Sequence, residues 1–129
     1  MREINFSQHW PKLDCETIMT FRCARRDKDW AVGERVRLVL HARSKQRKVL
    51  FEADIVAKEP RWIRVFPSKP FLGQENFPVI SSKEAEEDGF KDDDRDPALF
   101  HLWEYMWQTY GARILKEPVN KLTLRRVKP

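Results

Sequence analysis

Alternating apolar and polar positions dominate the first half of the chain and predict short β-strands. In residues 35–43, Val36, Leu38 and Leu40 fall on one face of an extended chain, and Arg35 and Arg37 fall on the other. Residues 48–59 repeat the pattern after a polar turn, so we expect a hairpin with one buried face. Further strands are expected at residues 4–7, 16–24, 61–67 and 120–128, and a turn or a single helical turn at residues 7–14.

Helical periodicity appears only in the second half of the chain. Ser81 and Glu84 have the spacing of a capping box, and Gly89 provides a stop, which predicts a first short helix. A second helix is expected to have Asp96 as its N-cap, Pro97 as its first residue and residues 98–110 as its body. The loop at residues 68–80 holds prolines and phenylalanines and is expected to pack over another part of the protein.

The order of these elements predicts an α+β fold in one domain, residues 1–129. A small curled sheet removes its free edges when the last strand pairs with an early one, so we expect a barrel of five to six strands with two or three helices packed on it. Eight residues are expected to be buried together: Val36, Leu38, Leu40, Phe51, Ile55, Leu102, Trp103 and Met106.

Charge and composition narrow the functional classes. Residues 1–75 hold 16 Lys and Arg against 10 Asp and Glu, whereas residues 76–129 hold 9 against 10. A basic first part suits a polyanionic partner such as RNA, although basic strands are also found as plain solvated faces. The chain has no apolar run long enough for a membrane span and no apolar segment near its start that would suit a secretory signal.

The cysteine and histidine patterns point away from a metal or disulfide framework. Cys15 and Cys23 are the only cysteines, and two thiols at this spacing are typical of reduced residues in the cytoplasm. The three histidines are widely separated and match no metal-site spacing. We therefore expect a cytoplasmic monomer without metal or cofactor.

Several short motifs in fixed order resemble the ASCH domain of the PUA-like superfamily. They are Thr-Phe-Arg at residues 20–22, Val-Gly-Glu-Arg-Val-Arg-Leu at residues 32–38, Ala-Glu-Glu-Asp-Gly-Phe at residues 85–90, and a Trp-rich helix. The resemblance extends from Phe6 to the last strand. It implies a PUA-like mixed β-barrel with a cleft lined by the Thr-x-Arg strand and by the acidic residue before Gly-Phe. Such domains resemble RNA-binding modules, and one branch hydrolyses the acyl amide of N4-acetylcytidine with a Lys, a Thr and a Glu.

The resemblance assigns candidate residues one by one. Thr20 matches the motif Thr, Arg22 matches the motif Arg, and Asp88 stands in place of the Glu. Thr20 and Asp88 are thus the candidate catalytic residues. The position of the family's Lys falls on Thr17, which has no nitrogen to activate a nucleophile or hold an oxyanion. Lys12 is nearby, but nothing in the sequence places it in the cleft, so slow or absent hydrolysis is expected.

Arg22 is costly to bury among apolar neighbours unless it is paired, and the resemblance makes Asp88 its expected partner, either directly or through one water molecule. Together with Thr20 they are the expected ligand-binding residues, although Arg22 and Asp88 could equally form a structural ion pair. Trp10 and Trp30 lie outside the amphipathic stripes and are candidate base-stacking platforms, with rim packing as the alternative.

The first functional reading is a domain that binds RNA or a modified nucleoside or nucleotide. The second is an enzyme on the same cleft, either an amidohydrolase of modified nucleosides or a ribonuclease. The third is a protein-interaction module. The cations expected to attract nucleic-acid phosphates are Arg35, Arg37, Arg43, Lys45, Arg47 and Lys48.

Overall fold

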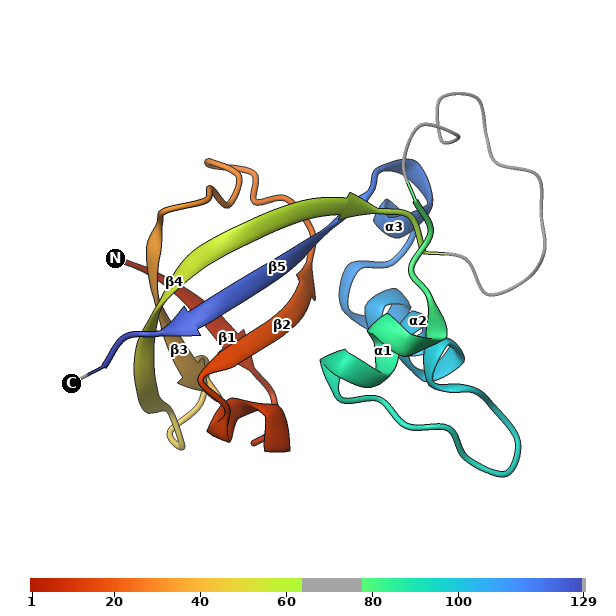
Figure 1. Cartoon of the computed structure of the whole chain (residues 1–129), viewed down its shortest axis with the longest axis horizontal. Helices are drawn as coiled ribbons and strands as arrows, with labels where there is room; N and C mark the ends of the chain where they lie inside the picture. Colours follow the sequence, from red (N-terminus) through yellow and green to blue (C-terminus); the bar gives the residue numbers. More distant parts are fainter. Residues whose placement is uncertain (64–77, 129) are drawn as a thin grey trace.

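A computed structural model describes residues 1–63 and 78–128 as a curled sheet with a group of helices at one end (Figure 1). Both chain termini lie at the side away from the helices. The strands are β1 (Arg2–Phe6), β2 (Thr17–Arg22), β3 (Arg35–Leu40), β4 (Lys48–Arg61) and β5 (Val119–Arg126), and the helices are the 3-10 turn η1 (Pro11–Asp14), α1 (Ser82–Asp88), α2 (Ala98–Tyr110) and α3 (Arg113–Lys116).

The fold is α+β, as the sequence predicts, but the sheet is not a closed barrel. Its five strands have the order β1-β3-β4-β5-β2, and the β1–β3 pair is parallel while the other pairs are antiparallel. The last strand does pair with an early one, because β5 lies between β4 and β2. The two edge strands β1 and β2 do not pair with each other in the described part of the chain, and this open seam takes the place of the expected closure.

The predicted core divides into two clusters rather than one. Val36, Leu38, Leu40 and Ile55 pack inside the curled sheet, whereas Leu102 and Met106 belong to a second cluster under the helices. Phe51 and Trp103 are only partly buried and pack against the margin of these clusters. The prediction of a single shared core was therefore wrong. Phe51 and Trp103 are only partly buried, and the other six residues belong to two separate clusters.

Strand β2 lies between the two clusters and contributes residues to both. Its even-numbered residues, beginning with Ile18, face the inside of the sheet, while Phe21 and the following Cys23 face the helices. Apolar residues therefore stand on both faces of β2, with Ile18 on one face and Phe21 on the other.

The helix ends follow the sequence signals with one correction. Ser81 and Glu84 form both hydrogen bonds of the capping box of α1, and Gly89 ends this helix with a φ of 116°. In α2 the N-cap is Pro97 rather than Asp96, and the Asp92 carboxylate accepts the hydrogen bond of the Ala98 N–H at 2.6 Å. A carboxylate further back along the loop thus does the capping that was predicted for Asp96.

The structure tests the strand expected at residues 61–67 and the loop expected at residues 68–80 only in part. Arg61 is the last residue of β4, and Trp62 forms an isolated parallel bridge with Val79. Residues 64–67 of the expected strand and residues 68–77 of the expected loop lie outside the described residues. Cys15 and Cys23 are free thiols. Within residues 1–63 and 78–128, the helices lack the length and apolar character that a membrane crossing requires.

Candidate functional site

Thr20, Arg22 and Asp88 line one small recess, as expected from the sequence. The recess lies where the open seam between β1 and β2 meets the helices. Its free volume is about 20 Å³, enough for one water molecule or one small polar group. The full lining comprises Phe6, Trp10, Lys12, Thr20, Phe21, Arg22, Asp88, Phe90, Tyr105, Met106, Thr109 and Tyr110.

Strand alternation brings Thr20 and Arg22 into this recess. Both share a face of β2 with Ile18, which packs inside the sheet, so the same face becomes polar toward the end of the strand. Asp88 is the last residue of α1 and is buried, with 6% of its surface exposed. Thr17 is exposed at the far end of β2 and does not reach the recess.

Sequence reasoning missed the lysine of this site. Lys12 projects from the turn η1, and its ammonium donates hydrogen bonds to the Asp88 carboxylate and to the Met19 carbonyl, the latter at 3.0 Å. The side chains of Lys12 and Asp88 are only 11% and 8% exposed. The available signal was Pro11, which favours the first position of a helical turn and thereby fixes the start of η1. No local pattern gives the direction in which Lys12 points.

Burial shifts both members of this pair toward their neutral forms. Desolvation lowers the pKa of Lys12, and the nearby Asp88 opposes that shift only in part. Desolvation likewise raises the pKa of Asp88 against the opposing influence of Lys12 and, more weakly, of Arg22. A neutral amine can accept a proton and a neutral carboxylic acid can donate one, so the pair has the groups needed for general acid–base chemistry.

Arg22 and Asp88 line the same recess, but the predicted direct hydrogen bond or ion pair between them is not formed. Its Nε donates to the Thr20 hydroxyl at 3.3 Å, and its guanidinium lies over the Phe6 ring at 4.8 Å. Asp88 takes Lys12 as its partner because η1 carries that ammonium directly to the end of α1. Arg22 therefore lies at ion-pair distance from no carboxylate within residues 1–63 and 78–128, although its charge still acts weakly on Asp88.

The two candidate stacking residues differ in their availability. Trp10 is partly exposed, packs against Phe90 at a centroid distance of 5.3 Å, and borders the recess. Trp30 is 5% exposed, and the guanidinium groups of Arg2 and Arg25 lie over its ring at 4.6 and 5.3 Å. These cations occupy the ring, so Trp30 cannot serve as the predicted platform for a base. Trp10 remains the candidate for stacking on a base.

Two larger hollows adjoin the recess. The first, of about 580 Å³, shares Trp10, Lys12 and Phe90 with it and also includes His101, and we call it the outer groove. The second, of about 300 Å³, shares Arg22 and Tyr110 with the recess, and we call it the basic hollow. Both fall within or near the size range of small-molecule sites, whereas the recess alone does not.

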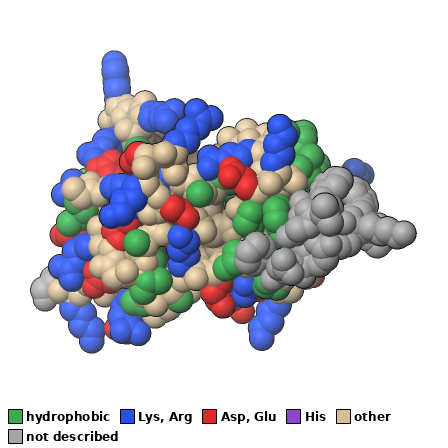
Figure 2. All heavy atoms as spheres, turned by 90° about the horizontal axis from the view of Figure 1, so that it is seen from above, with side chains coloured by type: hydrophobic (Ala, Val, Ile, Leu, Met, Phe, Trp, Pro, Cys, Tyr) green, Lys and Arg blue, Asp and Glu red, His purple; other side chains and the backbone are tan. Residues whose placement is uncertain are grey.

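The predicted phosphate-attracting cations do not form one free surface. Arg35 is bound by Asp54 at 2.9 Å, and Arg37 and Arg47 both pair with Glu3. Figure 2 accordingly shows Lys and Arg side chains interspersed with Asp and Glu over the sheet. Arg43, Lys45 and Lys48 have no carboxylate partner within the described ranges, and Arg43 borders the basic hollow.

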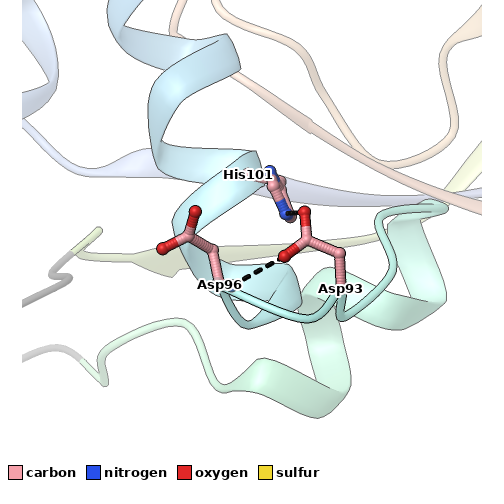
Figure 3. Close-up of side chains that lie close together, drawn as sticks. All are labelled: Asp93, Asp96 and His101. Carbon is pink, nitrogen blue, oxygen red and sulfur yellow. Dashed lines mark hydrogen bonds and ion pairs between the residues drawn. The ribbon is translucent and has the colours of Figure 1, made fainter.

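Asp93, Asp96 and His101 come close enough to suggest a metal site, since their ligand atoms lie within 4.8 Å of one another. In Figure 3, Asp93 and His101 point toward each other while the Asp96 carboxylate is turned aside. His101 Nε2 lies 2.8 Å from one Asp93 oxygen, and the other oxygen accepts the N–H groups of Arg95 and Asp96. These contacts stabilise the loop before α2, which explains why the three residues lie close together.

No family model matches this sequence, and no curated protein or solved structure matches it either. The resemblance to the ASCH family therefore rests on its short motifs alone. The arrangement of charges in the recess is the observation from which a function can be argued.

Proposed function

We propose that this protein is an ASCH-type, PUA-like domain that binds RNA or a modified nucleotide in the cleft formed by the recess and its neighbouring hollows. The observation that carries the proposal is the convergence of Thr20, Arg22, Lys12 and Asp88 on one recess. Burying charged groups costs free energy, and such groups at the bottom of a cleft are characteristic of binding and catalytic sites.

The size of each hollow suggests how a ligand would lie. A base would fit the outer groove against Trp10 and Phe90, because aromatic faces stack well on bases. Its polar edge would enter the recess, where the Thr20 hydroxyl and the Lys12–Asp88 pair offer both donors and acceptors. The recess admits only a small polar group, which favours recognition of an exocyclic substituent.

Calorimetric titration with cytidine, N4-acetylcytidine and a short single-stranded RNA tests this proposal. Thr20→Val keeps the shape of the side chain but removes its hydroxyl, and should weaken nucleoside binding about fivefold to tenfold. Thr123→Val makes the same change on β5 outside the recess and should leave binding unaltered. Equal effects of the two variants, or no binding of any of these ligands, would contradict the proposal.

A second candidate function, amide hydrolysis, is favoured by the position of Lys12. The family's Lys position is occupied by Thr17, yet Lys12 brings an ammonium to the same recess as Thr20 and Asp88. In this reaction the pair acts in its uncharged form, with the shared proton on Asp88, and the Lys12 amine accepts a proton from a water molecule as the water oxygen bonds to the acyl carbon. The C–N bond breaks and protonated Asp88 donates its proton to the leaving nitrogen. Proton transfer from Lys12 to Asp88 then restores the pair.

Hydrolysis of N4-acetylcytidine to cytidine and acetate, followed by chromatography, tests this second function. Lys12→Arg keeps a positive charge for Asp88 but cannot act as a base, because the guanidinium pKa is far above neutral pH. We expect this variant to lose turnover while it still folds and binds the nucleoside. Lys116→Met removes an exposed lysine of α3 as a control. Absence of turnover in the unaltered protein would leave binding as the sole function of the cleft.

A further inference from the structure

We propose that Arg22 and Arg43 form an anion subsite in the basic hollow that holds a phosphate group of the ligand. This inference rests on the proposed function, because it identifies the ligand of the cleft as phosphorylated, a nucleotide or an RNA strand rather than a free nucleoside.

The basic hollow is strongly biased toward positive charge. Four arginines line it, against one carboxylate residue, Glu3. The Glu3 carboxylate is already bound by Arg47 and lies 3.8 Å from Arg37, so it is neutralised by cations outside the lining. The four arginines of the lining are Arg22, Arg25, Arg43 and Arg113.

These arginines are not equivalent. Arg25 pairs with Asp27 at 3.2 Å, and Arg113 pairs with Glu117 and donates to the Ala24 carbonyl. Arg22 and Arg43, by contrast, have no carboxylate partner within residues 1–63 and 78–128. A guanidinium has five N–H donors, and the single bond from Arg22 to Thr20 leaves most of its donors unused.

The turn that carries Arg43 is fixed against β1. The Asn5 side-chain oxygen accepts the Ala42 N–H at 2.9 Å, and the Phe6 carbonyl accepts the His41 N–H at 3.1 Å. Phe6 also lies beneath the guanidinium of Arg22. The same end of β1 therefore positions both cations, so that the subsite is partly organised before a ligand binds.

Phosphate is the anion that best matches this arrangement. It offers several acceptor oxygens to donors that come from different directions, and arginine binds it with two parallel hydrogen bonds. Arg22 lines both the recess and the basic hollow, so the proposed subsite adjoins the proposed base site at this residue. The phosphate could belong to a free mononucleotide or to an RNA strand, which share this chemistry.

Comparing cytidine with cytidine 5′-monophosphate by calorimetry tests the subsite. The monophosphate should bind at least about tenfold more tightly, as expected for charge-assisted hydrogen bonds. Arg43→Gln should remove most of this advantage and leave cytidine binding unchanged. Arg35→Gln also removes one positive charge, but Arg35 is bound to Asp54 and does not line the hollow, so both affinities should be retained.

A hexameric RNA distinguishes the two sources of phosphate. Loss of affinity in Arg43→Gln for the hexamer but not for the monophosphate would support the subsite and assign the phosphate to an RNA strand. Equal losses in Arg43→Gln and Arg35→Gln would overturn the proposal, because they would indicate a diffuse field rather than a subsite. Equal binding of cytidine and both phosphorylated ligands would overturn it as well and would leave the proposed function intact.

Inorganic phosphate, followed through the arginine Nε–H signals in NMR spectra, separates failure of the subsite from failure of the base site. If cytidine does not bind but phosphate shifts the Arg22 and Arg43 signals, the base site is wrong and the subsite is supported. If no nucleoside, nucleotide, RNA or phosphate binds, both proposals fail.

Discussion

The ammonium of Lys12 donates a hydrogen bond to the Asp88 carboxylate and so joins two residues that are 76 positions apart in the sequence. The contact links η1, at the edge of the sheet, to the last residue of α1. It also places an ion pair in a recess lined by aromatic rings.

Removing one member of this pair should be more harmful than removing both. Lys12→Met leaves the Asp88 carboxylate buried without its partner, and should lower the free energy of unfolding by about 3–5 kcal/mol. The double variant Lys12→Met with Asp88→Leu removes both charges and should recover most of this loss. Urea denaturation of Lys12→Met, of Asp88→Leu and of the double variant gives the coupling energy between the two residues. Additive effects would show that the two residues do not interact.

Acid should weaken the attachment of α1 to the sheet through Glu84. Burial opposes ionisation of this residue, but hydrogen bonds from Lys121, Ser81 and Arg61 outweigh it and lower the Glu84 pKa from 4.5 to about 2. A lowered folded-state pKa contributes stability above pH 4.5 that is lost as the pH falls toward 2. The full shift corresponds to about 3 kcal/mol, and solvent screening reduces it to about 2 kcal/mol.

Urea midpoints measured between pH 2 and pH 6 check this expectation. Glu84→Gln cannot ionise, so its stability should change less over this interval than that of the unaltered protein. An identical pH profile for the two proteins would contradict the assigned role of Glu84.

The two hydrophobic clusters should respond independently to truncation. Leu38→Ala opens a cavity inside the sheet and Leu102→Ala opens one under the helices, so each should cost about 2–5 kcal/mol. Because the residues belong to separate clusters, the double variant should show the sum of the two losses within about 0.5 kcal/mol. A coupling energy well above this value, measured by urea denaturation, would indicate one continuous core.

Gly89 is expected to control the position of Trp10. Its φ of 116° disfavours any other residue, and a methyl group there would lie 3.0 Å from Cε3 of Trp10. Gly89→Ala should therefore cost about 1–3 kcal/mol through backbone strain, and should also alter the near-ultraviolet circular dichroism of Trp10. Gly33→Ala is the matched control, since its φ is 91° but no atom lies within 4 Å of the added group. Unchanged aromatic signals in Gly89→Ala would refute the contact.

RNA binding should depend on salt through a small number of cations. Arg35, Arg37 and Arg47 are engaged by carboxylates, which leaves Arg22, Arg43, Lys45 and Lys48 as cations for phosphate contacts. Four contacts to a single strand predict that a tenfold rise in salt weakens binding about 600-fold. Affinity measured at several salt concentrations checks this slope. A flat response with retained binding would indicate a small neutral ligand instead.

Local sequence patterns were enough to predict most elements and many of their ends. The strands of the hairpin, the capping box at Ser81 and the stop at Gly89 follow from side-chain periodicity and from backbone preferences that act within a few residues. The polar face of β2 was visible in the same way, so Thr20 and Arg22 could be assigned to one side of a strand. The motif order suggested that Asp88 would join them.

The partners of these residues, by contrast, depend on long-range packing. The choice of Lys12 over Arg22 as the partner of Asp88 depends on how η1 approaches α1, and no local preference encodes that approach. The open seam between β1 and β2 likewise depends on how five strands curl together, and the burial of Trp30 depends on arginines from distant segments. Periodicity fixes which face of an element is apolar, whereas long-range packing fixes which faces meet, and the candidate site lies where two such faces meet.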